Sequence, residues 1–410
     1  MASKRCNIGA VGLLAVLLVM VACGPAAAPT VAPAQTPGAV AQPTAEPSGG
    51  GPVVIQLWST AWFPSSIAGR MALVDEFNKQ HEGKIKVEYI QGAWDTAETY
   101  VQNGIAAGGG IACVVEYHYE GALSWYRKGW VQDLRPYITP ERRALMIEEL
   151  WQSRTYPDDG AIVMNGTLLE EPTLVVLYNP KHLAAAGIEP ATIDEPWTWD
   201  QFIENAKLLT LDANGKHLGE EGFDASNVVQ WGFLPRLENE KVWEWGSFIA
   251  QQAQGKPVVR QENGRWGWYL DEEAKQAYDR FLSAVRVGVA PELAIGLSGD
   301  SLHQAFVDGK TSMILRETFA IPIILDSFPD TEIGAMPVPF QKGDKVLYKA
   351  AGEGMVIVKT CEHPEAAAEF LFWMMQPENL APYAAGNGML PANNAALDKE
   401  PLASDTTWKI

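Results

Sequence analysis

Short apolar and alternating segments divide the first part of the chain into strands and helices. The apolar run at 53–58 and the alternation at 85–90 predict strands, and the spacing of apolar positions at 71–77 predicts a helix between them. Residues 96–107 predict a second helix, which three consecutive glycines end, and 111–117 predict a third strand. This β-α-β-α-β order is typical of a parallel sheet with helices on both faces.

The rest of the chain continues to alternate between strands and helices. A capping box at Thr198–Gln201 opens a predicted helix that runs to about Leu209. The other predicted strands are 173–178, 228–234, 258–260, 313–315 and 355–358, and the other predicted helices are 271–287 and 365–375. We therefore expect an α/β protein. Because the roughly 360 residues after position 52 exceed the size of a single core, we expect two lobes.

The beginning of the chain has a different pattern. An apolar run of about 15 residues follows Lys4 and Arg5 and ends at Cys23. The run is too short for a membrane span, which needs roughly 20 residues, and it resembles a bacterial lipoprotein signal in which Cys23 becomes the lipidated first residue. The alternative is an ordinary secretory signal in which this cysteine is incidental. We expect residues 1–22 to be removed and the protein to be anchored to the outer face of a bacterial membrane.

Composition separates a tether from a globular part. Residues 23–52 are rich in Ala, Pro, Thr and Gly, which predicts a disordered spacer. The whole chain is 47% hydrophobic and has a net charge of −19, which argues against nucleic acid as a partner. Cys113 and Cys361 remain after the tether, and no C-x-x-C or Cys/His cluster indicates a zinc or redox site. We therefore expect no metal and no cofactor.

Five short segments, each weak alone, follow one another in a recognisable order. They are Phe77–His81, Lys128–Leu134, Leu177–Pro180 with Trp197–Phe202, Phe306–Lys310, and Glu365–Leu371 with Gly388–Pro391. Together they resemble the extracellular solute-binding proteins of sugar-type ABC importers, the family that includes maltose-binding protein. The resemblance implies two α/β lobes joined by a hinge of crossing strands, a ligand in the cleft, and delivery to the permease subunits of an importer.

The resemblance also implies how the chain divides. We expect 53–174 with 345–384 in the first lobe and 175–344 with 385–410 in the second, in a monomeric protein. In relatives a helical segment continues for tens of residues beyond the Leu-Pro marker. We therefore expect either a trimmed second lobe or a truncated sequence.

Aromatic residues after predicted strands indicate the ligand class. The apolar face of a sugar ring stacks on aromatic rings, and its hydroxyls bond to carboxylates and amides. The chain has 15 tryptophans, most of which we expect in the core or at interfaces. The predicted contacts of the first lobe are Thr60 and Trp62 after the first strand, Tyr117, His118 and Glu120 in the loop after the third, and Glu171 before the crossing strand. Glu171 is either a ligand contact or a solvated surface charge.

The predicted contacts of the second lobe include a departure from the family pattern. They are Trp231, Trp243, Arg316 and Phe319, and Glu353 at the hinge is a further predicted contact. Relatives often carry a sugar-stacking tryptophan where this chain has Phe319, which can still stack. Arg316 either clamps the carboxylate of an acidic ligand or pairs internally with Glu317 or Glu353. We expect Glu353, between two glycines, in a close-approach loop at the hinge.

The family comparison also suggests a disulfide. In relatives the strand before Cys361 runs antiparallel to the third strand, which implies a bond to Cys113 if the Cα atoms lie within about 7 Å.

Motifs of common enzymes are absent from the sequence. There is no G-x-S-x-G, H-E-x-x-H, G-x-x-x-x-G-K or strand-linked G-x-G-x-x-G. We therefore expect a binding protein without enzymatic activity, whose ligand is a mono- or oligosaccharide. The alternatives are a non-sugar solute, such as an acidic metabolite, a polyol phosphate or a polyamine, and a glycosidase that uses paired carboxylates.

Overall fold

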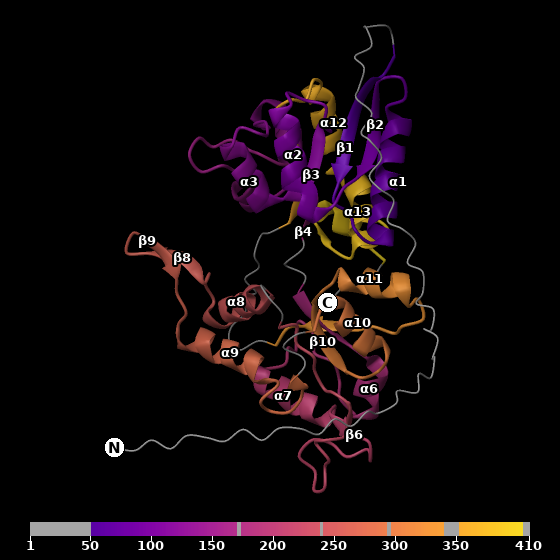
Figure 1. The fold of residues 1–410 in the computed structure, drawn as a ribbon, viewed down its shortest axis with the longest axis vertical. Coiled ribbons are helices and arrows are strands. Elements are labelled where there is room, and N and C mark those ends of the chain that lie inside the picture. The colour runs from indigo at the N-terminus through magenta and orange to yellow at the C-terminus, as the bar shows by residue number, and fades with distance from the viewer. Residues whose placement is uncertain (1–50, 170–173, 238–240, 293–296, 340–351, 405–410) are drawn as a thin grey trace, which may run out of the picture. The chain divides into compact units, whose positions relative to one another are not determined.

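A computed structural model describes residues 51–169, 174–237, 241–292, 297–339 and 352–404 (Figure 1). Two larger sheets form within these residues. The chain passes from the first sheet to the second between Leu169 and Leu174, and it returns between Pro337 and Glu353. We call the residues before the first crossing and after the second the first lobe, and those between the crossings the second lobe.

The sheet of the first lobe has the strand order β13-β4-β12-β3-β1-β2. Its strands are β1 (Val53–Ser59), β2 (Ile85–Gln91), β3 (Val114–His118), β4 (Leu168–Leu169), β12 (Glu353–Ile357) and β13 (Leu390–Pro391). Because β1 pairs in parallel with both β2 and β3, the predicted β-α-β-α-β unit is confirmed. Strand β12 runs antiparallel to β3, so a segment from late in the sequence extends this sheet.

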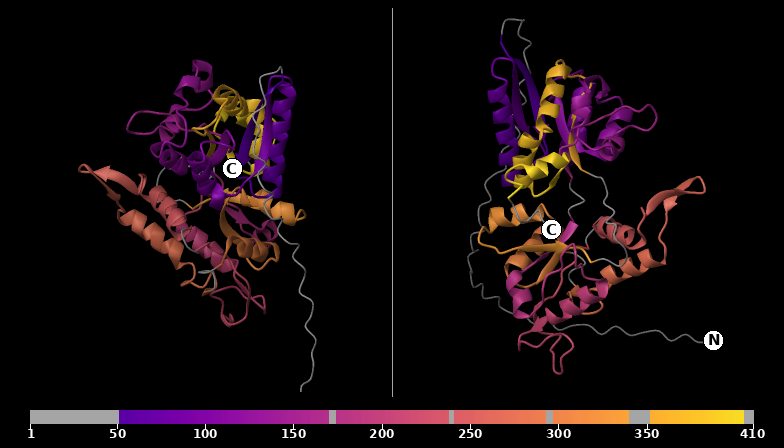
Figure 2. Two further views of the ribbon diagram at one scale, coloured as in Figure 1. Left: turned by 45° about the horizontal axis from the view of Figure 1, so that its top comes forward. Right: turned by 180° about the vertical axis from the view of Figure 1, so that it is seen from behind.

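Helices cover both faces of this sheet (Figures 1 and 2). They are α1 (Pro64–Gln80), α2 (Ala97–Ala106), α3 (Tyr119–Arg127), α4 (Pro140–Arg143), α5 (Glu148–Ser153), α12 (Pro364–Met374) and α13 (Pro377–Asn387). Phe77 of α1 and Phe370 of α12 share a core cluster with Leu57 of β1. Trp125 of α3 shares another with Trp58. Neighbouring strand residues point to opposite faces, so Leu57 and Trp58 divide β1 between the two clusters.

The second lobe is built on a three-stranded antiparallel sheet. Its middle strand is β5 (Leu174–Tyr178), which pairs with β10 (Met313–Glu317) and β11 (Gly334–Pro337). Its helices are α6 (Pro180–Ala185), α7 (Trp199–Leu208), α8 (Lys241–Gln254), α9 (Glu272–Ser283), α10 (Gly299–Val307) and α11 (Ala320–Ser327). The capping box that opens α7 is confirmed, because Thr198 and Gln201 each accept a hydrogen bond from the other's backbone N–H.

Two hairpins add short strands to the second lobe. They are β6 (Leu211–Asp212) with β7 (Val228–Gln230), and β8 (Val259–Glu262) with β9 (Arg265–Trp268). The second hairpin turns at Asn263 and Gly264, whose φ angles of 51° and 75° suit the tight turn of a two-residue hairpin. The strand expected at 228–234 is shorter than predicted, because beyond Gln230 the chain meets β10 and its lead-in only at isolated bridges.

Two expectations for the first lobe were wrong. The loop expected after the third strand is helix α3, which follows β3 directly and is capped by the His118 ring at the backbone N–H of Gly121. The segment 385–410 was assigned to the second lobe, but β13 pairs with β4 in the first-lobe sheet. Met389 and Leu402 pack with Leu73 of α1 in a common cluster, and this apolar contact keeps the described part of the segment on the first lobe.

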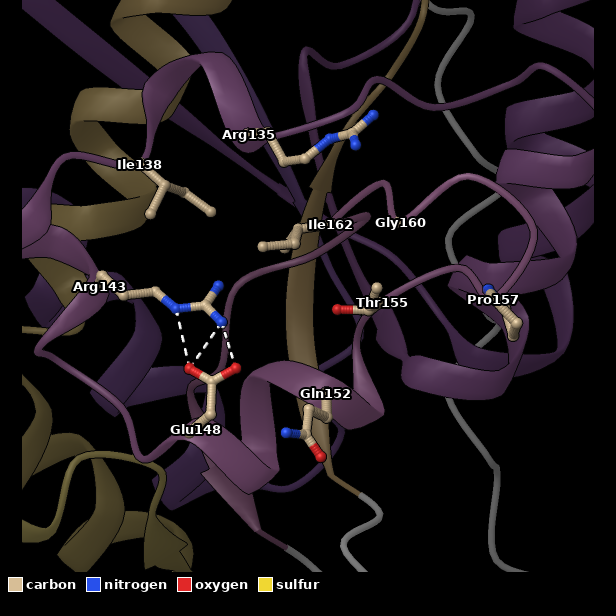
Figure 3. Close-up of a pocket in the computed structure, with 9 residues that line it drawn as sticks. All are labelled: Arg135, Ile138, Arg143, Glu148, Gln152, Thr155, Pro157, Gly160 and Ile162. Carbon is tan, nitrogen blue, oxygen red and sulfur yellow. Dashed lines mark hydrogen bonds and ion pairs between the residues drawn. The ribbon is translucent and has the colours of Figure 1, made fainter.

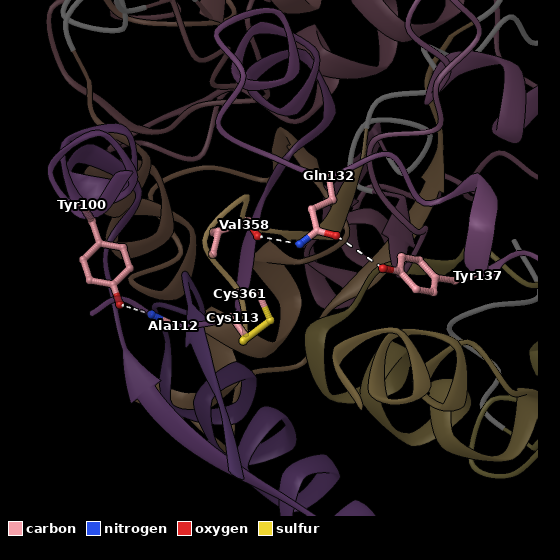
Figure 4. Close-up of a disulfide and its surroundings, with 7 residues drawn as sticks. All are labelled: Tyr100, Ala112, Cys113, Gln132, Tyr137, Val358 and Cys361. Carbon is pink, nitrogen blue, oxygen red and sulfur yellow. Dashed lines mark hydrogen bonds between the residues drawn. A yellow bond between two sulfur atoms is a disulfide. The ribbon is translucent and has the colours of Figure 1, made fainter. Parts of the chain in front are cut away.

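A disulfide joins the two segments of the first lobe (Figure 4). Cys113 immediately precedes β3, and Cys361 lies in the turn after β12. Their Cα atoms are 4.7 Å apart, within the distance that a disulfide requires. The backbone N–H of Val358 also donates to the carbonyl of Cys113 at 3.0 Å. The bond therefore fastens β12 to β3 across a sequence separation of 248 residues.

Replacing both Cys113 and Cys361 with serine is expected to lower the free energy of unfolding by about 2–5 kcal/mol, because the cross-link restricts the unfolded chain. Urea unfolding followed by tryptophan fluorescence measures this change. The wild-type protein kept in dithiothreitol is the control and should match the double variant. Equal stability of the oxidised and the reduced protein would contradict the prediction.

Candidate functional site

Aromatic side chains follow the three parallel strands of the first lobe at the points where each strand ends. Trp62 follows β1, Trp94 lies in a short 3-10 helix (Trp94–Thr96) after β2, and Tyr117 and His118 close β3. The carboxyl ends of parallel strands meet at one edge of a sheet, which is where open α/β sheets bind ligands. We call Trp62, Trp94, Tyr117 and His118 the strand-end site.

The rings of the strand-end site form a chain of contacts. The centroid of Trp94 lies 6.1 Å from those of Trp62 and His118 and 5.8 Å from that of Tyr117. Trp62 is 42% exposed, and the other three rings are half-buried. Partly exposed rings beside polar ring atoms suit the mixed apolar and polar surface of a sugar.

Buried neighbours hold Tyr117 and His118. The ring of Tyr117 stacks on buried Trp125 of α3, with the centroids 4.4 Å apart. A Cβ atom at Gly121 would lie 2.1 Å from the Tyr117 ring, so glycine is required there for the ring to lie against α3. The Nδ1 atom of His118 accepts a hydrogen bond from the Gly121 N–H at 3.2 Å, which fixes the imidazole as the N-cap of the helix.

Phe319 lies against the strand-end site from the segment after β10. Its ring meets Trp62 edge-on, with the centroids 5.7 Å apart. The residue is 7% exposed, and it belongs to the same cluster as Leu73 of α1 and Tyr383 of α13. The structure thus brings together four residues proposed from sequence, namely Trp62, Tyr117, His118 and Phe319.

A buried polar network lies beneath the loop that carries Trp62. The carboxylate of Glu116 accepts hydrogen bonds from the Ser59 hydroxyl at 2.5 Å and from the Thr60 backbone N–H at 3.1 Å, and it forms an ion pair with Arg70 of α1. Thr60 is fully buried and anchors the loop, and its role as a direct ligand contact stays a prediction. The turn after β1 directs Thr60 inward and leaves Trp62 exposed.

Charges balance one another in this network. Burial lowers the pKa of Arg70, but the coulombic effects of Glu116, Tyr383 and Glu353 outweigh it and raise that pKa above its ordinary value. Burial raises the pKa of Tyr383 well above its usual range. The arginine therefore stays charged and the tyrosine stays neutral at all ordinary pH values.

Glu353 belongs to the same buried region. It opens β12 opposite His118 and is 3% exposed. The close approach expected around it is present, because a Cβ atom at Gly354 would lie 2.2 Å from the Asn165 carbonyl oxygen. The segment is a strand and not a loop, and the carboxylate acts through its charge on Arg70.

Arg316 is buried and internally paired in the structure. Its Nε lies 3.4 Å from an Oε atom of Glu317, and both side chains are 3% exposed. Its Nη1 atom also contacts Nε2 of His303, and burial together with Arg316 and Arg236 lowers the pKa of His303 to about 3. The internal pair with Glu317, weighed above against a ligand contact, is therefore formed.

Trp231 lies near the start of β10, and its role as a ligand contact stays a prediction. It forms a bridge with Thr311, ahead of β10, whereas Phe319 follows the end of that strand. Glu171 and Cys23 lie outside the described residues. Glu120 belongs to α3 and Trp243 to α8, but their side chains are not among those described.

Trp94 was missed from the sequence, although a usable signal was present. It follows the second predicted strand by the same rule that selected Trp62 and Tyr117. Trp94 lies in the short gap between the strand predicted at 85–90 and the helix predicted from Thr96.

Two hollows of the surface lie away from the strand-end site. One cavity of about 600 Å³ lies on the first lobe, where Arg143 and Glu148 form an ion pair beside Gln152 and Thr155 (Figure 3). Another of about 460 Å³ lies on the second lobe between Asn179 and Glu332. Within the described ranges, no group of three or more His, Cys, Asp or Glu side chains could hold a metal ion. None of the helices in those ranges has the length and apolar character needed to cross a membrane.

Solved structures share this fold. The GacH receptor of Streptomyces glaucescens, solved unliganded and with acarbose, matches with a TM-score of 0.68 and 16% identity over 87% of this chain and 84% of that one. The cyclic α-maltosyl-1,6-maltose binding protein of Arthrobacter globiformis matches with a TM-score of 0.67 and 18% identity over 86% and 83%. The fold is thus that of the two-lobed solute-binding proteins, as the resemblance implied.

The sequence places the chain in a family. Residues 60–381 match the family model of the bacterial extracellular solute-binding proteins, and the chain belongs to this family. It is also 28% identical over 357 residues to a protein of Streptomyces antibioticus described as an uncharacterized lipoprotein in the oleD 5′ region. That match covers 86% of this chain and 73% of the relative.

Acidification is expected to destabilise the protein through His303. Its pKa is about 3 in the folded state and near 6.5 in an unfolded chain, so between these values the unfolded state binds the extra proton. The stability contributed by neutral His303 is therefore complete above about pH 6.5 and is lost as the pH falls, by about 1.4 kcal/mol per pH unit at most. Urea unfolding at pH 4 to 7 should show a shallower pH dependence for His303→Gln than for wild type. Parallel curves for the two proteins would contradict this assignment.

Proposed function

We propose that the protein is a lipid-anchored receptor that captures a mono- or oligosaccharide and delivers it to an ABC importer. The observation that carries the proposal is the strand-end site, in which three successive parallel strands each present an aromatic residue at the same sheet edge. Flat rings with exposed faces bind the C–H face of a pyranose, and their neighbouring polar atoms bind its hydroxyls.

The relatives support the same ligand class. The structures described above are named for acarbose and a cyclic maltose derivative, and a Thermus thermophilus protein with a TM-score of 0.61 and 19% identity over 87% of each chain was solved with maltotriose. The buried pairing of Arg316 with Glu317 leaves less reason to expect an acidic ligand, because that guanidinium already has an internal carboxylate. A neutral saccharide is therefore favoured over a uronate or another acidic metabolite.

The chemistry of the site supports a receptor without turnover. A glycosidase needs two carboxyl groups roughly 5–9.5 Å apart on either side of the scissile bond. Glu116 and Glu353, the two carboxylates of the buried network, lie beneath the site at 1% and 3% exposure. We therefore propose a non-enzymatic receptor whose two lobes enclose the sugar, with the two chain crossings as the hinge.

A thermal-shift screen tests the ligand class. Maltotriose, maltose, tagatose, galacturonate, sorbitol 6-phosphate and putrescine represent the competing solutes, and a ligand at about 100 times its Kd adds roughly 2.7 kcal/mol of stability. A shift with a neutral sugar alone supports the proposal. A shift only with galacturonate, the phosphate or the amine would replace the sugar by that solute, and release of monosaccharide from maltotriose would indicate a glycosidase.

Replacing Trp62 with alanine is expected to weaken sugar binding about tenfold, because the lost stacking area is worth about 1–2 kcal/mol. Isothermal titration calorimetry measures the change. The matched control is Trp268→Ala, which removes a tryptophan that is 60% exposed on the β8–β9 hairpin, and its affinity should equal that of wild type. Equal affinities for the two variants would place the sugar somewhere other than the strand-end site.

Replacing Cys23 with serine is expected to release the protein from the membrane, because the thiol is the proposed site of lipid attachment. Cell fractionation followed by mass spectrometry of the N-terminal peptide measures the effect. Wild type should pellet with membranes and carry the mass of a lipid, and Cys6→Ser is the control. A C23S variant that still pellets with membranes would point to another mode of attachment.

A further inference from the structure

A buried ion pair lies directly beneath the strand-end site. Arg70 of α1 is fully buried and Glu116 of β3 is 1% exposed. A pair this deep is costly to desolvate, and it is retained only when its hydrogen bonds are well satisfied. The bonds made by this pair connect it to the segments that carry Trp62, Tyr117 with His118, and Phe319.

The first connection runs to Trp62. The Oε2 atom of Glu116 accepts the hydroxyl of Ser59 and the backbone N–H of Thr60. The Ser59 hydroxyl oxygen in turn accepts the backbone N–H of Ala61 at 3.3 Å. Three successive residues ahead of Trp62 are thus held by one carboxylate and its partner.

The second connection runs along β3. Glu116 immediately precedes Tyr117 and His118, so holding its carboxylate also fixes the end of the strand from which those rings project. Glu353, which pairs with His118 across the sheet, acts on the charge of Arg70 and therefore belongs to the same electrostatic unit.

The third connection runs to Phe319. The guanidinium of Arg70 lies 3.8 Å from the centroid of the Tyr383 ring and donates to its hydroxyl oxygen, and that hydroxyl lies 3.4 Å from Oε1 of Glu116. Tyr383 packs in the same cluster as Phe319. Phe319, whose ring meets Trp62 edge-on, therefore packs in a cluster with a tyrosine that is bonded to the same pair.

From these contacts we infer that Arg70 and Glu116 are positioning residues, which set the aromatic geometry of the strand-end site and thereby its affinity for sugar without touching the ligand. The inference rests on the proposed function of that site.

The hydrogen-bond pattern makes a sharp test possible. Each oxygen of Glu116 faces two donors, Ser59 and Thr60 on Oε2 and Arg70 and Tyr383 on Oε1. Glutamine has the same shape but only one acceptor oxygen, so in Glu116→Gln an amide NH₂ must face donors on one side. The variant therefore loses the hydrogen bonds from either the Ser59–Thr60 loop or Arg70 and Tyr383, while the volume of the side chain hardly changes.

The experiment compares three variants by calorimetry with maltotriose, or with the saccharide that gives the largest thermal shift. Glu116→Gln and the double variant Arg70→Gln/Glu116→Gln are expected to weaken binding at least tenfold while the stoichiometry stays at one. The double variant avoids leaving a lone buried carboxylate. The matched control is Arg154→Gln, since Arg154 is an equally buried arginine of the first lobe that donates to the carbonyls of Leu150 and Asn165. Its affinity should stay within twofold of wild type.

Fluorine NMR gives a readout that does not require a ligand. In protein labelled with 5-fluorotryptophan, the resonances of Trp62 and Trp94 are assigned with Trp62→Phe and Trp94→Phe. Both resonances should move in Glu116→Gln and stay in place in Arg154→Gln, whereas a purely structural loss of stability would move neither in the folded protein.

The outcomes separate the inference from the proposed function. Unchanged resonances in Glu116→Gln, or unchanged affinity despite moved resonances, overturn the inference. Equal loss of affinity in Arg154→Gln also overturns it, because any buried arginine would then suffice. If wild type binds no saccharide, the sugar proposal fails alone. The fluorine spectra then still decide whether the pair sets the site, with moved resonances in support and unmoved ones against.

Discussion

The antiparallel pairing of β12 with β3 is the contact on which the first lobe depends. It brings residues 353–357 beside 114–118 and carries α12 and α13 with it. Helix α12 covers one face of the sheet, and α13 supplies Tyr383, which completes the surroundings of Arg70 and Glu116. The disulfide between Cys113 and Cys361 closes the end of this pairing opposite the strand-end site. One strand pair therefore supports the core, the disulfide and the buried ion pair beneath the strand-end site.

Elements with a local signal were predictable, and elements defined by distant partners were not. The alternation at 85–90 and the run at 53–58 became β2 and β1 because a half-buried or buried strand needs only its own side-chain pattern. Strands β4 and β13 have two residues each, and they exist only because β4 pairs with β12 and β13 pairs with β4. Helix α3 follows β3 without a polar break, and histidine is a poor N-cap signal, so it was taken for a loop.

The candidate site shows the same division. Proximity to a strand end was enough to find Trp62, Tyr117 and His118, because the topology of a parallel sheet gathers its carboxyl ends. The sequence did not show which side chains of the turn point inward, so Thr60 was predicted as a ligand contact although the turn buries it. The sequence could not decide whether Arg316 pairs with a ligand, with Glu317 or with Glu353. In the structure it pairs with its neighbour Glu317. The burial of Arg70 could not be predicted from the sequence, since an arginine in a helix is usually a surface residue.

The divided sequence of the first lobe has a consequence for how the protein is made. Synthesis proceeds from the N-terminus, so the whole second lobe emerges before β12 exists. Throughout that interval the edge of β3 has no partner on its β12 side, and an open strand edge is prone to pair with other chains. The second lobe is contiguous and has its own core, so it can fold during the same interval. The length of the second lobe therefore sets how long the nascent chain carries an open edge, and a longer second lobe would extend its exposure to aggregation.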